Sequence, residues 1–140
     1  PSIMTVMHSF GMECTKRNNI HYLGPGILVF AVGNVVEILD LETMQQTYLP
    51  GLDGQGIGAI TVHPSRKYFA VAEKGANPNT YVYEYPSLHL YKIMRNGTEK
   101  GYSAARFNKE GNKLATVGMF PDYWLTVWNW EEESIILRSK

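Results

Sequence analysis

The chain has 140 residues, a hydrophobic content of 44% and a formal net charge of zero at pH 7. This length fits about one domain, and the apolar content is too high for a disordered chain. A neutral total argues against a nucleic-acid-binding surface, which carries a clustered basic excess. No apolar run approaches the roughly 18 residues of a membrane span, and the single cysteine, Cys14, excludes an internal disulfide. We therefore expect an ordered domain without nucleic-acid or membrane partners.

The first 56 residues predict two incoming strands and one three-stranded unit. Residues 3–10 and 18–23 have strand composition and flank a polar stretch. Residues 27–32 are nearly continuously apolar, as in a strand buried on both faces. Gly33-Asn34 then predicts a two-residue hairpin. The returning strand is followed by a more polar outer strand and a Gly-rich link, at residues 35–41, 44–49 and 50–56.

Two later segments repeat one order of strand, turn, strand, loop and strand. Laid over each other at a spacing of about 45 residues, Ala70 meets Ala115, Val82 meets Val127 and Tyr83 meets Trp128. The expected strands lie at residues 57–62, 68–72 and 81–85, and again at 102–107, 113–117 and 126–130. An outer strand follows each segment, at residues 88–94 and 134–137.

This period, with three or four short strands in each unit, is typical of β-propeller blades. The third strand of each unit ends in a residue pair at the position of the Trp-Asp dipeptide of WD repeats: Leu39-Asp40, Tyr83-Glu84 and Trp128-Asn129. An antiparallel sandwich also has short strands and regular turns, but it gives no reason for a constant period. The sequence therefore predicts an all-β fold of about three four-stranded antiparallel WD-repeat blades.

Three blades do not close a ring, because propellers have about four to eight. We therefore expect a fragment of a larger WD-repeat β-propeller. Its divisions are expected to be incoming strands at residues 1–26 and blades at residues 27–56, 57–101 and 102–140.

The sequence contains no motif that requires a cofactor, a metal or a catalytic group. The stretch Gly54-Gln55-Gly56-Ile57-Gly58-Ala59 matches the dinucleotide-binding pattern, but strand-like residues follow it where that motif needs a helix. We expect these glycines to form a tight link between blades. The four histidines lack metal-ligand spacing, and His63 is expected to be exposed in a turn. A propeller enzyme, or a propeller attached to an enzyme, stays open as an alternative.

One acidic residue is expected to act inside a blade. In many WD-repeat blades an Asp six residues before the Trp accepts hydrogen bonds, helped by a His in the preceding link and a hydroxyl on the second strand. Asp122 has this spacing, Asn77 has it in the second unit, and Thr116 is the expected hydroxyl partner of Asp122. Neither link contains a His. The predicted structural set is Leu39, Asp40, Tyr83, Glu84, Thr116, Asp122, Trp128 and Asn129.

The long loops before the third strand of the later units are expected on the same face as the links between blades. They mix charged and aromatic groups, which suits a protein interface. Packing against a neighbouring blade is the equally weighted alternative. The candidate interaction residues are Glu73, Lys74, Asn77, Asn79, Lys100, Phe120 and Tyr123.

Several segments together carry a family resemblance. They are residues 8–11, 14–19, 31–41, 71–75 and 81–85. This combination resembles the amino-terminal propeller of the cilia- and flagella-associated protein 44 family, which are large axonemal WD-repeat proteins. His63-Pro64-Ser65 also looks like the echinoderm microtubule-associated-protein-like group. Leu39, Tyr83, Glu84 and Asn129 depart from the common Trp-Asp pattern.

The resemblance implies a non-catalytic scaffold, without cofactors, on the doublet microtubules of motile cilia and sperm flagella. It further implies a tether for the motor heads of an inner dynein arm. The implied partners are an inner-arm axonemal dynein heavy chain, the doublet microtubule and a related axonemal WD-repeat protein. A general cytosolic WD-repeat adaptor, or a microtubule-associated propeller without a ciliary role, is the alternative.

Overall fold

A computed structural model describes residues 20–139, and this part of the chain consists of strands joined by turns and loops. The strands are β1 (Ile20–Gly24), β2 (Ile27–Val32), β3 (Val35–Asp40), β4 (Gln46–Pro50), β5 (Ile57–Val62), β6 (Tyr68–Glu73), β7 (Thr80–Glu84), β8 (Leu90–Met94), β9 (Tyr102–Phe107), β10 (Leu114–Gly118), β11 (Leu125–Asn129) and β12 (Ser134–Ser139). The strand expected at residues 3–10 lies outside the described residues.

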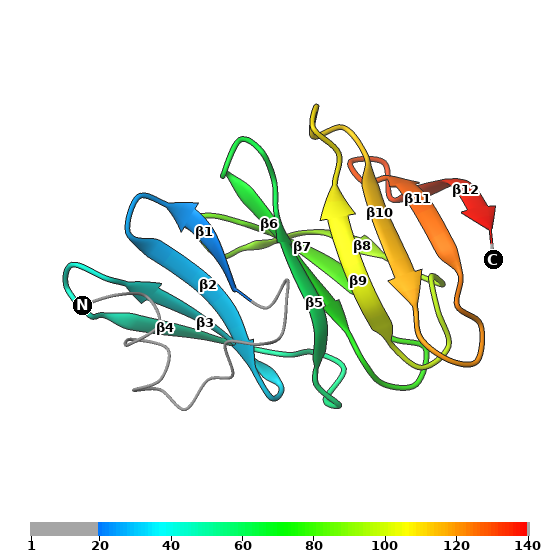
Figure 1. Ribbon diagram of the computed structural model, residues 1–140, viewed down its shortest axis with the longest axis horizontal. Helices are drawn as coiled ribbons and strands as arrows, with labels where there is room; N and C mark the ends of the chain where they lie inside the picture. Colours follow the sequence, from blue (N-terminus) through cyan, green and yellow to red (C-terminus); the bar gives the residue numbers. More distant parts are fainter. Residues whose placement is uncertain (1–19, 140) are drawn as a thin grey trace.

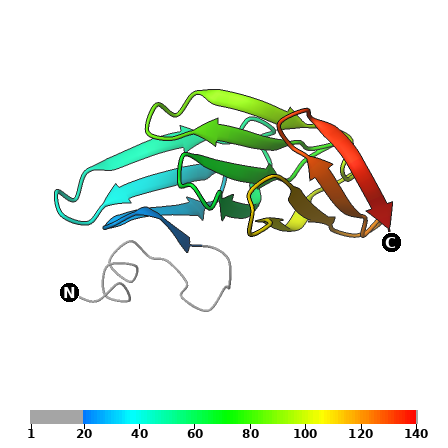
Figure 2. The same ribbon diagram turned by 90° about the horizontal axis from the view of Figure 1, so that it is seen from above.

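The strands form three four-stranded sheets, β1–β4, β5–β8 and β9–β12, in which each strand pairs with its neighbour in the chain. All of these pairs are antiparallel. The sheets stand side by side in an arc, with β1, β5 and β9 along one side and β4, β8 and β12 along the other (Figures 1 and 2). The predicted all-β fold of three four-stranded blades is confirmed. The first sheet includes β1, which precedes the expected blade start at residue 27.

The core lies between the sheets, and the middle sheet is buried on both faces. On one face, Val71 and Tyr83 pack with Val29 and Ile38 of the first sheet. On the other, Ala70 packs with residues of the third sheet, including Leu114 and Trp128. Successive side chains of a strand point to opposite faces. The apolar run in β6 therefore contributes to both interfaces at once.

The aromatic or aliphatic member of each predicted Trp-Asp pair is buried, at Leu39, Tyr83 and Trp128. The Trp128 indole Nε1–H donates to Thr116 Oγ1 at 2.9 Å, and the Tyr83 ring stacks on Phe69. Each pair ends its strand, β3, β7 or β11. The polar members Asp40, Glu84 and Asn129 are half-buried at the strand ends.

The glycine-rich stretch before β5 is a link between sheets, and a strand follows it. Gly58 lies within β5, where a Cβ atom would clash with the Tyr102 carbonyl oxygen on β9. The inner strands of two sheets therefore approach so closely that only glycine fits. The link interpretation agrees with this geometry, and the helix that a dinucleotide motif needs is absent from residues 20–139.

We expect Trp128→Ala to lower the free energy of unfolding of the third sheet by about 3–5 kcal/mol, because a fully buried indole is removed. Thr116→Val should cost less, about 1–3 kcal/mol, because it leaves the indole N–H without its acceptor. Hydrogen exchange of peptides from β10 and β11 in the full-length protein would measure both effects.

The exposed turn residue Glu132 provides the matched control, and Glu132→Ala should leave exchange unchanged. Unaltered exchange in Trp128→Ala would contradict its place in the core.

Candidate protein-interaction site

One end of the sheets gathers the links and the long loops, the lower end in Figure 1. We name this end the loop face, and it comprises residues 51–56, 74–79, 95–101 and 119–124. Backbone hydrogen bonds join its segments: Lys74 N–H donates to the Gly56 carbonyl at 2.9 Å, Gly75 N–H to Lys100 at 3.0 Å and Met119 N–H to Gly101 at 2.8 Å. The loops and links therefore form one continuous surface, on the face where the sequence predicts them.

Asp122 anchors the 119–124 loop from inside. Its side chain is 8% exposed. The carboxylate accepts hydrogen bonds from the Thr98 hydroxyl at 3.0 Å, the Glu99 amide at 2.8 Å and the Trp124 amide at 3.1 Å. The predicted partner was wrong: Thr98 supplies the hydroxyl, whereas Thr116 bonds the Trp128 indole. Thr98 belongs to the link, so this carboxylate ties the loop of the third sheet to the strand connection before it.

The Asp122 carboxyl is ionised at neutral pH. Burial acts to raise its pKa, but hydrogen bonds from Trp124, Glu99 and Thr98, with the positive charge of Arg138, outweigh burial and lower the pKa below its ordinary value. Arg138 is itself ordered by a cation–π contact, 4.4 Å from its guanidinium carbon to the centre of the Trp124 ring. The Asp122 side chain is therefore an ionised carboxylate, and both of its oxygens accept hydrogen bonds.

Two aromatic side chains of the same loop point to solvent. Phe120 is 66% exposed and Tyr123 is 59% exposed, and their ring centres lie 6.3 Å apart. Tyr123 has a φ of +51°, a left-handed conformation that is unusual for a bulky residue. Such strain persists only where the surroundings enforce it. The inward bonds of Asp122 provide that constraint, and its neighbours face outward as a result.

The neighbouring 74–79 loop is joined to the β4–β5 link by carboxylates. Glu73 is 0% exposed and accepts hydrogen bonds from the Leu52 amide at 3.0 Å and the Asp53 amide at 2.9 Å. Asp53 in turn accepts from the Asn79 amide at 2.9 Å and the Tyr81 hydroxyl at 2.8 Å. Burial raises the pKa of Glu73, and these amide bonds partly offset it. The expectation that Glu73 contacts a partner is corrected, because its side chain is enclosed by the protein.

The other candidate loop residues differ in accessibility. Asn77 and Lys100 are exposed, whereas Lys74 and Asn79 are half-buried. Residues 20–139 contain no group of three His, Cys, Asp or Glu placed to hold a metal ion. In the same range, no helix has the length and hydropathy needed to cross a membrane. The loop face thus offers apolar rings beside lysines, a combination suited to contact with another protein.

Sequence reasoning missed Thr98 and Asp53. Both lie in links, and both contact a loop more than 20 positions away in the chain. Thr98 lies in the link where many WD repeats carry a His, and a hydroxyl residue in that link is the sequence signal for this contact.

We expect Asp122→Asn to speed hydrogen exchange in the 119–124 loop at pH 7, because it lowers the free energy of local opening by about 1–3 kcal/mol. Because folding lowers the pKa of Asp122, its carboxylate stabilises the fold above the unfolded pKa of about 3.9, and this contribution is lost as pH falls through the lower folded value. The difference between wild type and variant should therefore shrink below about pH 4.

Exchange rates of the full-length protein, corrected for intrinsic pH dependence, would measure this difference. Glu132→Gln, at the opposite end of the sheet, is the control. A difference that stays constant down to pH 3 would argue against an ionised anchor.

No protein-family profile matches the chain, but sequence comparison finds relatives. The chain is 52% identical over 137 residues to cilia- and flagella-associated protein 44 of Mus musculus, and 44% identical over 137 residues to the protein of that name in Chlamydomonas reinhardtii. In Trypanosoma brucei brucei, a protein of the same name is 38% identical over 131 residues.

These matches cover 98%, 93% and 93% of this chain. The chain spans only 7%, 8% and 7% of the respective relatives. By sequence, the chain is therefore homologous to one segment of the cilia- and flagella-associated protein 44 family.

Proposed function

We propose that this chain is part of a non-catalytic β-propeller scaffold in the axoneme of a cilium or flagellum, and that it binds another protein through the loop face. One observation carries the proposal: Phe120 and Tyr123 are exposed on a loop that the buried Asp122 carboxylate fixes from inside. The homology to proteins named for cilia and flagella supports the cellular setting.

The proposed mechanism is rigid presentation. Aromatic side chains on an ordered loop lose little conformational freedom on binding, so more of the contact energy appears as affinity. The rings would fill an apolar pocket of the partner, as aromatic residues at the centre of interfaces commonly do. Lys74 and Lys100 lie beside the 119–124 loop. The Gly75 amide donates to the Lys100 carbonyl, and the Met119 amide donates to the carbonyl of the next residue, Gly101. An acidic rim on the partner would complement them.

For the partner we propose an inner-arm axonemal dynein heavy chain, whose motor heads the scaffold would hold near the doublet microtubule. A related axonemal WD-repeat protein would lie alongside. These identities rest on the family resemblance, and the chain itself contributes the surface that would make the contact.

Cross-linking with mass spectrometry on intact motile cilia tests the partner and the face together. Lys74 and Lys100 lie on the loop face, whereas Lys109 lies in the β9–β10 turn at the opposite end. We expect links from Lys74 or Lys100, and none from Lys109, to a dynein heavy chain, a tubulin or an axonemal WD-repeat protein. Recovery of the protein only from the soluble cytosolic fraction would contradict the proposal and favour a general WD-repeat adaptor.

A double variant, Phe120→Ala with Tyr123→Ala, should weaken partner binding by about 30-fold or more, since truncating a central interface residue costs about 2 kcal/mol or more. Folding should be spared because both side chains are exposed. Retention of the tagged full-length protein on salt-washed axonemes would measure the effect. Tyr48→Ala, an exposed tyrosine on the outer strand β4, is the matched control. Equal retention of the double variant and wild type would refute the loop-face contact.

A further inference from the structure

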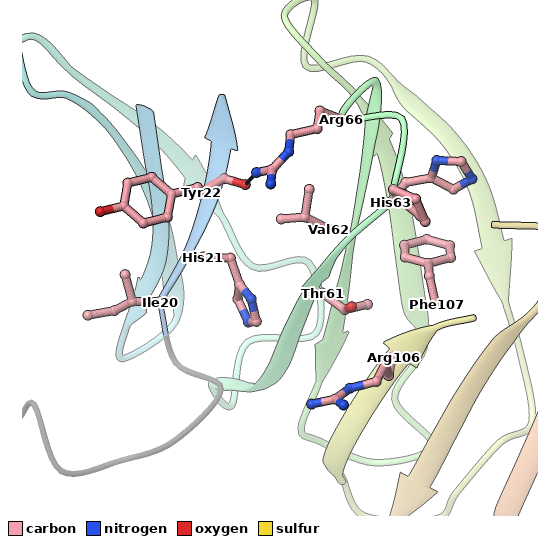
Figure 3. A pocket seen from close by; sticks show the side chains of 10 residues that line it. Ile20, His21, Tyr22, Thr61, Val62, His63, Arg66, Arg106 and Phe107 are labelled. Carbon is pink, nitrogen blue, oxygen red and sulfur yellow. Dashed lines mark hydrogen bonds between the residues drawn. The ribbon is translucent and has the colours of Figure 1, made fainter. Parts of the chain in front are cut away.

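A cavity of about 440 Å³ opens between the inner strands, at the end of the sheets opposite the loop face. It is bordered by β1, by the end of β5 with the following turn, and by the end of β9 (Figure 3). Its lining residues are Ile20, His21, Tyr22, Thr61, Val62, His63, Pro64, Arg66, Arg106 and Phe107. None of the structural or loop-face residues discussed above belongs to it.

The charge of this lining is one-sided. Two arginines, Arg66 and Arg106, border the cavity, and none of its lining residues is Asp or Glu. Within residues 20–139 a salt bridge forms elsewhere, between Arg95 and Glu133 at 3.7 Å. Neither cavity arginine is paired with a described carboxylate. In a chain whose formal net charge is zero, this local excess of cations creates a positive potential that attracts anions.

Both ring nitrogens of His63 already have partners within the protein. The Ser65 amide donates to its Nδ1 at 3.0 Å, so the ring hydrogen lies on Nε2, which donates to the Gly111 carbonyl at 2.7 Å. The ring also packs edge-on against Phe107 and Trp130. The expectation that His63 is exposed was wrong: it is half-buried and joins the second sheet to the third. The arginines are therefore the main charged groups available to a ligand.

Arg66 is oriented toward the cavity by its turn. It has a φ of +63°, and its guanidinium donates to the Tyr22 carbonyl of β1 across the cavity (Figure 3). A guanidinium has five N–H donors, so this bond leaves donors for a bound group. Arg106 on β9 is exposed and extends toward the same cavity. Thr61 on β5 also lines the cavity and lies between the two arginines in Figure 3.

The surroundings favour a peptide as the source of the anion. β1, β5 and β9 are each the first strand of their sheet, so one edge of each has no strand partner within its sheet. A strand edge without a partner can offer backbone donors and acceptors to an extended chain. Arginine forks match a carboxylate with two parallel hydrogen bonds.

We propose that this cavity binds an acidic peptide segment, with Arg106 and Arg66 each contacting a carboxylate of that segment and Thr61 among the residues that line the site. The site is separate from the loop face, so the proposal does not depend on the proposed function.

The test is fluorescence anisotropy with the full-length protein and a labelled hexaglutamate peptide, with hexaglutamine as the neutral comparison. We expect hexaglutamate alone to bind, and its affinity to fall with added salt. Arg106→Gln should weaken binding about tenfold, in line with the loss of a charge-assisted hydrogen bond. Arg66→Gln should weaken it similarly. Lys109→Gln and Arg95→Gln remove cations outside the cavity and should leave affinity unchanged.

Equal binding of the two peptides, or equal affinity in Arg106→Gln and wild type, would overturn the proposal. Failure of hexaglutamate to bind would also overturn it. Inorganic phosphate is the third probe. Arg106-dependent binding of phosphate without binding of hexaglutamate would assign the cavity to a free anion and refute the peptide. Because Arg106 is exposed on an edge strand, its substitution tests binding without removing a core contact.

Discussion

The structure depends on face-to-face burial between neighbouring sheets. A single four-stranded sheet of this chain cannot cover its own apolar side chains, and Phe69, Ala70, Val71 and Ala72 are buried at four consecutive positions of β6. Consecutive residues of a strand face opposite ways, so both faces of the middle sheet need a neighbour. The links and turns must therefore keep the three sheets stacked. Polar contacts at the ends of the sheets help to hold neighbouring sheets together.

Those polar contacts join the sheets at both ends by different chemistry. At the loop face, carboxyl groups accept hydrogen bonds from backbone amides: Asp122 contacts the link that precedes its sheet, and Glu73 does the same one sheet earlier. Folding lowers the pKa of Asp122 but raises that of Glu73. Burial opposes ionisation of both, but Asp122 also receives the Thr98 hydroxyl and the charge of Arg138, whereas Glu73 lies near the negative Asp53. At the other end the imidazole of His63 contacts the Gly111 carbonyl.

The features that arise within one repeat unit could be predicted from the sequence. Strand order, the repeat near 45 residues and the buried position of Trp128 follow from alternation and spacing within one unit. The hydrogen-bond partner of Asp122 could not be predicted from the sequence, because choosing Thr98 over Thr116 requires knowing which link packs against which loop. Glu73 was misassigned for the same reason, since the amides that enclose it come from residues about 20 positions earlier. The misplacement of His63 also reflects contacts between sheets, to Gly111 and Trp130.

The two candidate surfaces lie at opposite ends of the same inner strands. A six-residue strand such as β5 or β9 spans about 20 Å, more than twice the Debye length of about 8 Å at physiological ionic strength. The cations of the inner cavity therefore have little electrostatic influence on the aromatic loop at residues 119–124. Yet both ends are fixed to the same stacked sheets, one through Asp122 and the other through His63. The two proposed contacts are therefore compatible with each other, because the sheets set the distance between the surfaces while solvent screens their charges from each other.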